Sequence, residues 1–165
     1  MTTSSPGQTS TYSSALTTNS PRYDRTGRSL YNYYYESIQI NASVNGYYSI
    51  RSVSSVDTYG YLYASSFDPL NPTVNLVGLN DDGAGNAQFL ISYNLRSDIT
   101  YILVFTTYSA FVTASFSVVA TGPGQVYFNL INSQTTLTTR TNTVITSPPI
   151  STGIRKSIYR KIVFE

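Results

Sequence analysis

Hydrophobic and polar residues alternate along the middle of the chain, and turn-forming residues interrupt this alternation at short intervals. Residues 35–41 and 110–120 alternate cleanly, and residues 99–108 form the most hydrophobic segment. Alternation with a period of two is typical of β-strands that bury one face. No window combines helical periodicity with capping residues. The pattern therefore predicts an all-β fold.

Short strands are expected wherever β-prone residues lie between clusters of Gly, Asn and Asp. The dipeptide Asn45-Gly46 predicts a hairpin turn. Side chains expected to be buried are Leu90, Ile102, Val104, Phe116 and Val118. The predicted strands are residues 33–41, 47–53, 57–63, 74–79, 89–95, 99–108, 110–120 and 126–130. Seven to eight short strands predict a jelly-roll-like antiparallel β-sandwich with extended Ser/Thr-rich tails.

The composition divides the chain into four segments. Residues 1–21 are rich in Ser and Thr and are expected to form an N-terminal arm that cannot fold alone. Residues 22–130 form the expected sandwich, and residues 131–153 a Ser/Thr/Pro linker. Residues 154–165 combine apolar and basic side chains and predict a separate C-terminal strand.

The composition also excludes several classes of function. The 165 residues include no Cys and no His, which rules out thiolate or imidazole metal sites, Ser-His-Asp triads and disulfides. We therefore do not expect an enzyme. The apolar runs are shorter than the roughly 18 residues that span a membrane, and the first twenty residues lack the features of a signal peptide.

Charge is scarce and unevenly distributed. Charged residues make up 11% of the chain. Residues 29–139 carry two basic and six acidic side chains, whereas residues 140–165 carry five basic and one acidic. The basic end could contact phosphates, but the acidic middle and the lack of a groove-reading motif argue against nucleic-acid binding.

Three carboxylates form the clearest candidate site. Asp57 precedes a predicted strand, and Asp81 and Asp82 lie in a turn after another, so the fold could bring them to one end of the sandwich. Hard oxygen ligands of this kind suit Ca²⁺. The alternative is that the Asn and Asp side chains of residues 80–83 (NDDG) only stabilise a tight turn by capping local backbone groups. No pair among the acidic residues is singled out as a glycosidase pair. Calcium is the only cofactor that the sequence suggests.

Tyrosines and one sequon supply further candidates. Tyr33, Tyr35, Tyr59, Tyr61 and Tyr63 alternate, so each series lines one face of its strand. Such faces could stack on sugars or contact matrix proteins; the alternative is that they belong to the core or stabilise the sheet. Residues 41–43 form an N-glycosylation sequon at Asn41, and the Ser/Thr-rich ends could carry O-glycans.

Three segments together resemble the pre-peptidase C-terminal (PPC) domain, and most closely the PPC-like repeats of long secreted extracellular proteins. These segments are residues 57–63 (DTYGYLY), 79–83 (LNDDG) and 100–104 (TYILV), in the order that the family shows. The resemblance covers a little over half of the chain. It implies a compact sandwich that serves as a non-catalytic accessory module, and some relatives bind collagen or calcium.

Two functional classes follow from these observations. In the first, the chain is an extracellular structural or adhesive protein whose copies join into a fibre or filament by strand addition of the C-terminal segment. The residues expected to make this contact are Ile154, Arg155, Lys156, Ile158, Tyr159, Arg160, Lys161, Ile162, Val163 and Phe164. In the second, it is a monomeric accessory module of a secreted protein that binds matrix components or carbohydrate.

Overall fold

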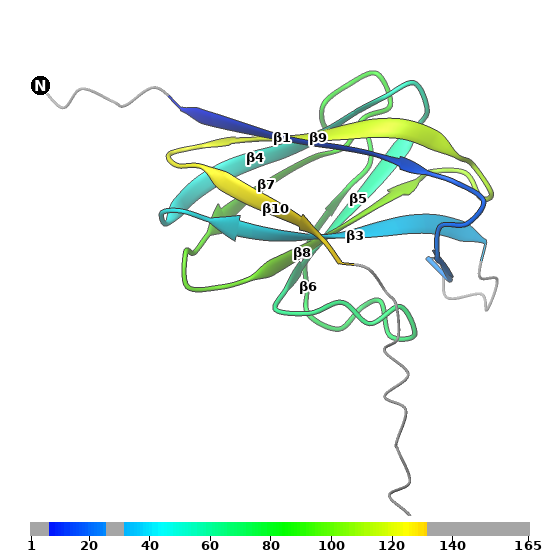
Figure 1. Ribbon diagram of the computed structural model, residues 1–165, viewed down its shortest axis with the longest axis horizontal. Coiled ribbons are helices and arrows are strands. Elements are labelled where there is room, and N and C mark those ends of the chain that lie inside the picture. The colour runs from blue at the N-terminus through cyan, green and yellow to red at the C-terminus, as the bar shows by residue number, and fades with distance from the viewer. Residues whose placement is uncertain (1–6, 26–31, 132–165) are drawn as a thin grey trace, which may run out of the picture. The chain divides into compact units, whose positions relative to one another are not determined.

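The computed structural model describes residues 7–25 and 32–131, and every regular element in these ranges is a β-strand (Figure 1). The prediction of an all-β fold is confirmed. The ten strands are β1 (Gln8–Leu16), β2 (Arg22–Tyr23), β3 (Tyr33–Ala42), β4 (Gly46–Ser54), β5 (Thr58–Ala64), β6 (Leu76–Asn80), β7 (Leu90–Leu95), β8 (Tyr101–Thr107), β9 (Ala114–Gly122) and β10 (Val126–Leu130). The eight predicted strands correspond to β3–β10, and the two additional ones precede them.

Antiparallel pairing joins the strands into two sheets. The first has the order β1-β9-β4-β7, and the second has the order β10-β3-β8-β5-β6, with β2 paired to β3. Figure 1 shows β1 lying along β9 on the outside of the first sheet. The two sheets pack face to face, which confirms the predicted antiparallel sandwich.

The connection at Asn45-Gly46 is not the hairpin that the sequence predicts. β3 pairs with β8 and β10, whereas β4 pairs with β7 and β9, so this short connection crosses from one sheet to the other. Asn45 Oδ1 accepts hydrogen bonds from the backbone N–H and the hydroxyl of Ser97, at 2.7 and 3.0 Å. The asparagine therefore fastens a loop at the end of the sandwich instead of closing a two-stranded ribbon.

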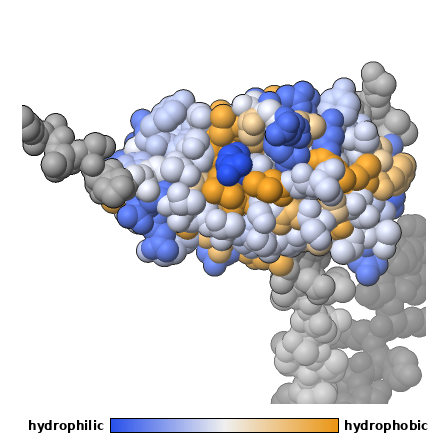
Figure 2. All heavy atoms as spheres, turned by 90° about the horizontal axis from the view of Figure 1, so that it is seen from above, coloured by the Kyte–Doolittle hydropathy of each residue, from blue (hydrophilic) through white to orange (hydrophobic). Residues whose placement is uncertain are grey.

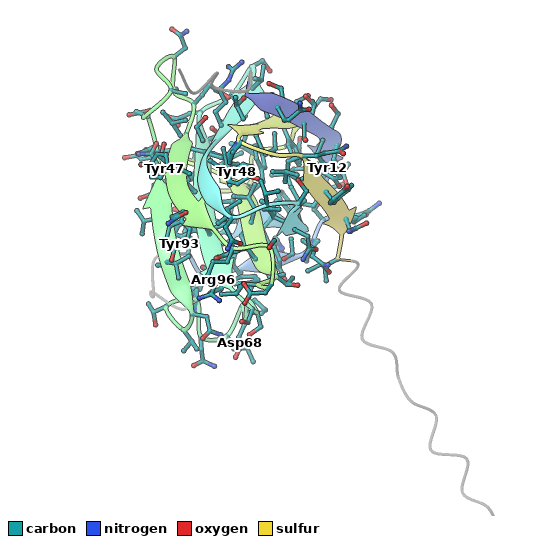
Figure 3. The ribbon with its side chains drawn as sticks, turned by 90° about the vertical axis from the view of Figure 1, so that its left-hand side faces the viewer. Tyr12, Tyr47, Tyr48, Asp68, Tyr93 and Arg96 are labelled. Atoms are coloured by element: carbon teal, nitrogen blue, oxygen red, sulfur yellow. The ribbon has the colours of Figure 1, made fainter. Side chains whose placement is uncertain are left out.

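The main core lies between the sheets. Alternate residues of each strand point inward, as the consecutive residues Tyr47 and Tyr48 illustrate (Figure 3): Tyr47 is 68% exposed and Tyr48 is fully buried. Phe105 of one sheet and Phe116 of the other stack with ring centroids 3.6 Å apart. Interdigitation of inward side chains from both sheets is what holds a sandwich together.

Four of the five predicted core residues are buried. Ile102, Val104, Phe116 and Val118 are at most 4% exposed. Leu90 is only half-buried, because its register places it opposite the exposed Arg51 while Ile91 points into the core. The prediction for Leu90 is therefore wrong by one position, an error that moves a strand residue to the opposite face.

A second apolar cluster covers the outer face of the larger sheet. It contains Tyr23, Tyr35, Tyr63, Ile102 and Val104, with Phe67 packed against it. β8 is consequently buried on both faces, which explains why residues 101–107 read as a continuous hydrophobic run and not as an alternating one.

The N-terminal arm expected at residues 1–21 contains a strand of the sandwich. β1 pairs with β9 from Gln8 opposite Gly122 to Leu16 opposite Ala114. Its Ser and Thr side chains offer too little apolar surface to fold alone, but β9 supplies a ready edge on which the strand can complete its backbone hydrogen bonds. Residues 131–165 were expected to form a linker and a strand; apart from Ile131 they lie outside the described residues.

Candidate functional site

The fold brings the three predicted carboxylates together at one end of the sandwich. Asp57 directly precedes β5, and Asp81 and Asp82 directly follow β6, its neighbour in the sheet. One carboxylate oxygen from each residue lies within 4.8 Å of the other two. Asp57 and Asp81 are half-buried, whereas Asp82 is exposed.

Asn80 fills the capping role that the turn interpretation gives to the Asn and Asp side chains of residues 80–83. Asn80 Oδ1 accepts hydrogen bonds from the backbone N–H groups of Gly83 at 2.7 Å and Leu90 at 2.8 Å. In contrast, Asp57 Oδ1 and Asp81 Oδ1 are inaccessible to solvent and have no hydrogen-bond partner. Two acidic oxygens are therefore left without a structural role in the turn, at a cost in desolvation.

Burial and mutual repulsion disfavour ionisation of the cluster. The pKa of Asp57 is raised by desolvation and then by the charges of Asp81 and Asp82. The pKa of Asp81 is raised by desolvation and by Asp82. Arg25 acts in the opposite direction on both groups, but among the described residues it forms no ion pair with them. The negative charge is only partly compensated.

Arg25 is held beside this cluster by aromatic rings. Its guanidinium carbon lies 4.4 Å from the ring centroid of Tyr33 and 4.5 Å from that of Tyr59, and Nη2 donates to the Tyr108 carbonyl at 2.8 Å. Cation–π contacts of this kind stabilise a partly desolvated charge. Arg25 is thus positioned by two aromatic rings and a backbone carbonyl and not by the carboxylates.

The donor set fits a hard divalent cation. Ca²⁺ binds oxygen ligands at 2.3–2.6 Å, so two ligands of one ion can lie up to about 5 Å apart, which includes the 4.8 Å spread of these oxygens. Three carboxylates fall short of the usual six to eight ligands, and backbone carbonyls and water would supply the rest. Asp57, Asp81 and Asp82 would hold the ion.

The five alternating tyrosines share the outer face of the larger sheet. Tyr35 and Tyr63 are at most 4% exposed and belong to the second cluster, and Tyr59 and Tyr61 stack on each other with centroids 4.8 Å apart. Tyr33 and Tyr59 also contact Arg25. Most of this aromatic surface is therefore used within the molecule, as the sheet-stabilising interpretation expects.

A groove of about 350 Å³ lies beside the second cluster. Its floor is apolar, with Tyr35, Phe67 and Ile102 among its lining residues, and Ser37, Ser65 and Ser66 add hydroxyl groups. Its volume lies at the lower end of the roughly 300–1,000 Å³ that small-ligand sites span. The groove was not predicted, because its walls come from β3, β8 and a loop that no sequence pattern connects.

The remaining predicted sites are placed as follows. Asn41 lies within β3, where its Nδ2 donates to Thr100 Oγ1 at 3.0 Å and its Oδ1 accepts from Gln39 Nε2 at 2.7 Å. Its glycosylation stays a prediction. The ten residues of the predicted assembly segment, from Ile154 to Phe164, lie outside the described residues.

No protein-family model matches this chain, and no curated protein sequence matches it. The resemblance to PPC domains stays a prediction. The described residues contain no helix that is long and apolar enough to cross a membrane.

Sequence reasoning found the carboxylates and the turn residue Asn80 but missed Arg25. Asp57 and the Asp81-Asp82 pair could be found because each adjoins a strand end. Arg25 has no local signal, since Tyr59 and Tyr108 are far from it in sequence. Asn80 was expected to cap the turn, but the second hydrogen bond that it accepts, from Leu90 ten positions away, has no local signal.

Proposed function

We propose that the chain is an extracellular structural or adhesive subunit whose copies join by β-strand addition into a fibre or filament. The observation that carries the proposal is the composition of the sheet edges. β1, β7, β10 and β6 lie at the ends of the two sheets, and none of them contains a charged residue or Pro. Natural proteins commonly protect edges with such residues to prevent pairing between chains.

Of the three charged residues that occur in strands, Arg22 lies on the two-residue β2, which pairs only with β3, and the other two lie away from the edges. Glu36 lies on β3 and Arg51 on β4, and both strands have neighbours on either side. Much of the surface in Figure 2 is pale, with hydrophobic residues in a band across it. A weakly charged surface offers little repulsion between approaching copies.

The segment expected to add to an edge is residues 154–164. It is β-prone, and its basic residues would meet a body whose residues 29–139 are acidic overall. The extracellular setting rests on the resemblance to domains of secreted proteins. The support from the structure is the set of uncharged sheet edges to which a strand could be added. The support from the sequence is the segment of residues 154–164 that would be the added strand.

The mass of the full chain in solution tests the proposal. Size-exclusion chromatography with light scattering should give species larger than one 18.2 kDa chain, and deletion of residues 154–165 should remove them while the β-sheet circular dichroism persists. Ile162→Asp should weaken assembly by interrupting the apolar side of the added strand, whereas Ser157→Asp, which adds the same charge at a polar position, should not. A full chain that stays monomeric at high concentration contradicts the proposal.

A second function is favoured by the groove. The alternative is a monomeric accessory module that binds matrix proteins or carbohydrate, with the ligand in the groove beside Phe67. Under this alternative, Phe67→Ala abolishes binding to immobilised collagen or glycans and leaves the chain monomeric. Leu70→Ala is the matched control, because Leu70 is in the same loop but 71% exposed and outside the groove.

A further inference from the structure

β1 is attached to the sandwich mainly by backbone pairing and by hydroxyl groups. Leu16 is its one buried side chain, and Tyr12 is partly buried against the core. Strands with few buried apolar contacts separate from a fold at low free-energy cost. Separation of β1 from β9 would therefore take only Leu16, and in part Tyr12, out of the core.

The polar contacts of β1 are made to groups that every copy of the chain presents. Tyr12 Oη and Ser14 Oγ donate to the two carboxylate oxygens of Glu36, at 2.6 and 2.8 Å. Ser13 Oγ lies 2.8 Å from Ser117 Oγ on β9. Tyr12, labelled in Figure 3, also packs against Phe128 with ring centroids 5.9 Å apart. The strand of a second copy would find the same partners.

The residues that follow the turn after β1 are more deeply buried in the sandwich than those of β1. Residues 17–20 form a turn in which the Ser20 N–H donates to the Thr17 carbonyl at 3.0 Å. The next residue, Pro21, accepts a hydrogen bond from the Tyr35 N–H at 3.0 Å, and Tyr23 is fully buried between Tyr35 and Phe67. Residues 17–20 are thus placed to act as a hinge.

We propose that β1 is exchanged between copies: the β1 strand of one chain pairs with β9 of another, with residues 17–20 as the hinge. The inference rests on the proposed self-association and adds a second connection to it, at the opposite end of the sequence from residues 154–164. Exchange recreates each contact of the closed form between two chains, so its cost is limited to opening the hinge and associating the copies.

Cysteine pairs test the exchange directly, because the chain contains no Cys. Ser13 and Ser117 are directly opposite in the β1–β9 ladder, and opposed positions in antiparallel strands are close enough to form a disulfide. Full-length Ser13→Cys and Ser117→Cys proteins are mixed, concentrated and oxidised. Exchange predicts a disulfide-linked band of twice 18.2 kDa on non-reducing gels, and its loss on reduction.

Ser92→Cys is the matched control partner for Ser13→Cys. Ser92 is an exposed serine on β7, at the far edge of the same sheet, so this mixture should show only the background of random collisions. The double variant Ser13→Cys/Ser117→Cys shows whether the pair can form a disulfide within one chain. A double variant that closes internally, with no excess of the mixed band over the control, overturns the proposal.

Shortening the hinge gives a readout that does not depend on disulfide chemistry. Deleting residues 18–20 should prevent β1 from returning to its own β9 and should shift the chain from monomer to dimer in light scattering; a folded deletion variant that stays monomeric overturns the exchange. If the parent forms oligomers without the mixed disulfide, the exchange fails and the proposed function stands. If the parent is monomeric, the proposed function fails, and the deletion variant alone decides whether β1 exchanges.

Discussion

Asp57, Asp81 and Asp82 concentrate three like charges within a few ångströms, and the fold provides little to neutralise them. Arg25 is near but is held by the rings of Tyr33 and Tyr59, and the capping work of the turn is done by Asn80. Two carboxylate oxygens are consequently buried without partners. From this arrangement we predict that stability depends on cations and on pH.

Addition of calcium is expected to raise the melting temperature. A cation that binds the folded carboxylates and not the unfolded chain stabilises the fold by mass action, so chelator should lower the melting temperature again. Asp81→Asn should remove most of the response, whereas Asp98→Asn, in an exposed ion pair with Arg96, should retain it. An identical melt in chelator and in excess calcium would leave the cluster without a role in cation binding.

Without divalent cations, we expect protonation of the acidic cluster at low pH to stabilise the fold. The pKa values of Asp57 and Asp81 are raised above the ordinary 3.8 in the folded state. The stability that the protonated carboxyl groups contribute is therefore fully present below pH 3.8, and it is lost as the pH rises through the raised pKa. Asp57→Asn and Asp81→Asn should therefore be more stable than the parent at pH 7, with the difference shrinking toward pH 4. Measuring each variant against the parent is essential, because the lowered pKa values of Asp68 and Asp98 act in the opposite direction.

At the scale of the strand, β8 shows how burial on both faces concentrates stability. Leu103 and Phe105 point into the main core, whereas Ile102 and Val104 pack in the second cluster. Both sets of side chains are removed from water, so both stabilise the folded state through the hydrophobic effect.

Truncation of Ile102 tests whether the second cluster is a true core. Ile102→Ala should reduce the free energy of unfolding by about 2–5 kcal/mol, as expected for a buried aliphatic side chain. Leu79→Ala on β6 is the matched control, because Leu79 is 49% exposed and should cost much less. Equal denaturant midpoints for the two variants would show that the outer face is solvated.

The sequence predicts strands well where their own side chains carry the signal. Residues 126–130 match β10, and residues 33–41 match β3 to within one position. It fails where a partner decides the structure: β1 has no apolar pattern and exists because β9 offers an edge, and Asn45-Gly46 connects two sheets because each flanking strand pairs elsewhere. The carboxylate cluster was predictable because its residues adjoin strands that carry their own signal. The position of Arg25 was not predictable, because it depends on partners that are distant in sequence.

At the scale of the whole molecule, most pairings join distant parts of the chain. β3 pairs with β8, and β4 with β9, so each ladder closes a long loop. Loops of this kind must be ordered before their contacts form, and folds dominated by them fold slowly.

The sandwich should therefore refold on a timescale of about milliseconds to seconds. Stopped-flow fluorescence of the tyrosines after dilution from denaturant measures this rate. Truncating Phe116, whose ring joins the two sheets by stacking on Phe105, should destabilise the fold, and Tyr127→Ala, at a position 52% exposed, should leave the rate close to that of the parent. Refolding within microseconds would contradict a topology built from long-range pairs.

The pairing of β1 with β9 also has a consequence for synthesis on the ribosome. Thr9 and Thr121, which face each other across this ladder, are separated by 112 positions. At 5–20 residues per second, the ribosome needs roughly 5–20 s to travel between them. β1 therefore leaves the ribosome that long before β9, and until β9 follows each nascent chain carries an unpaired strand past its neighbours on the same messenger RNA.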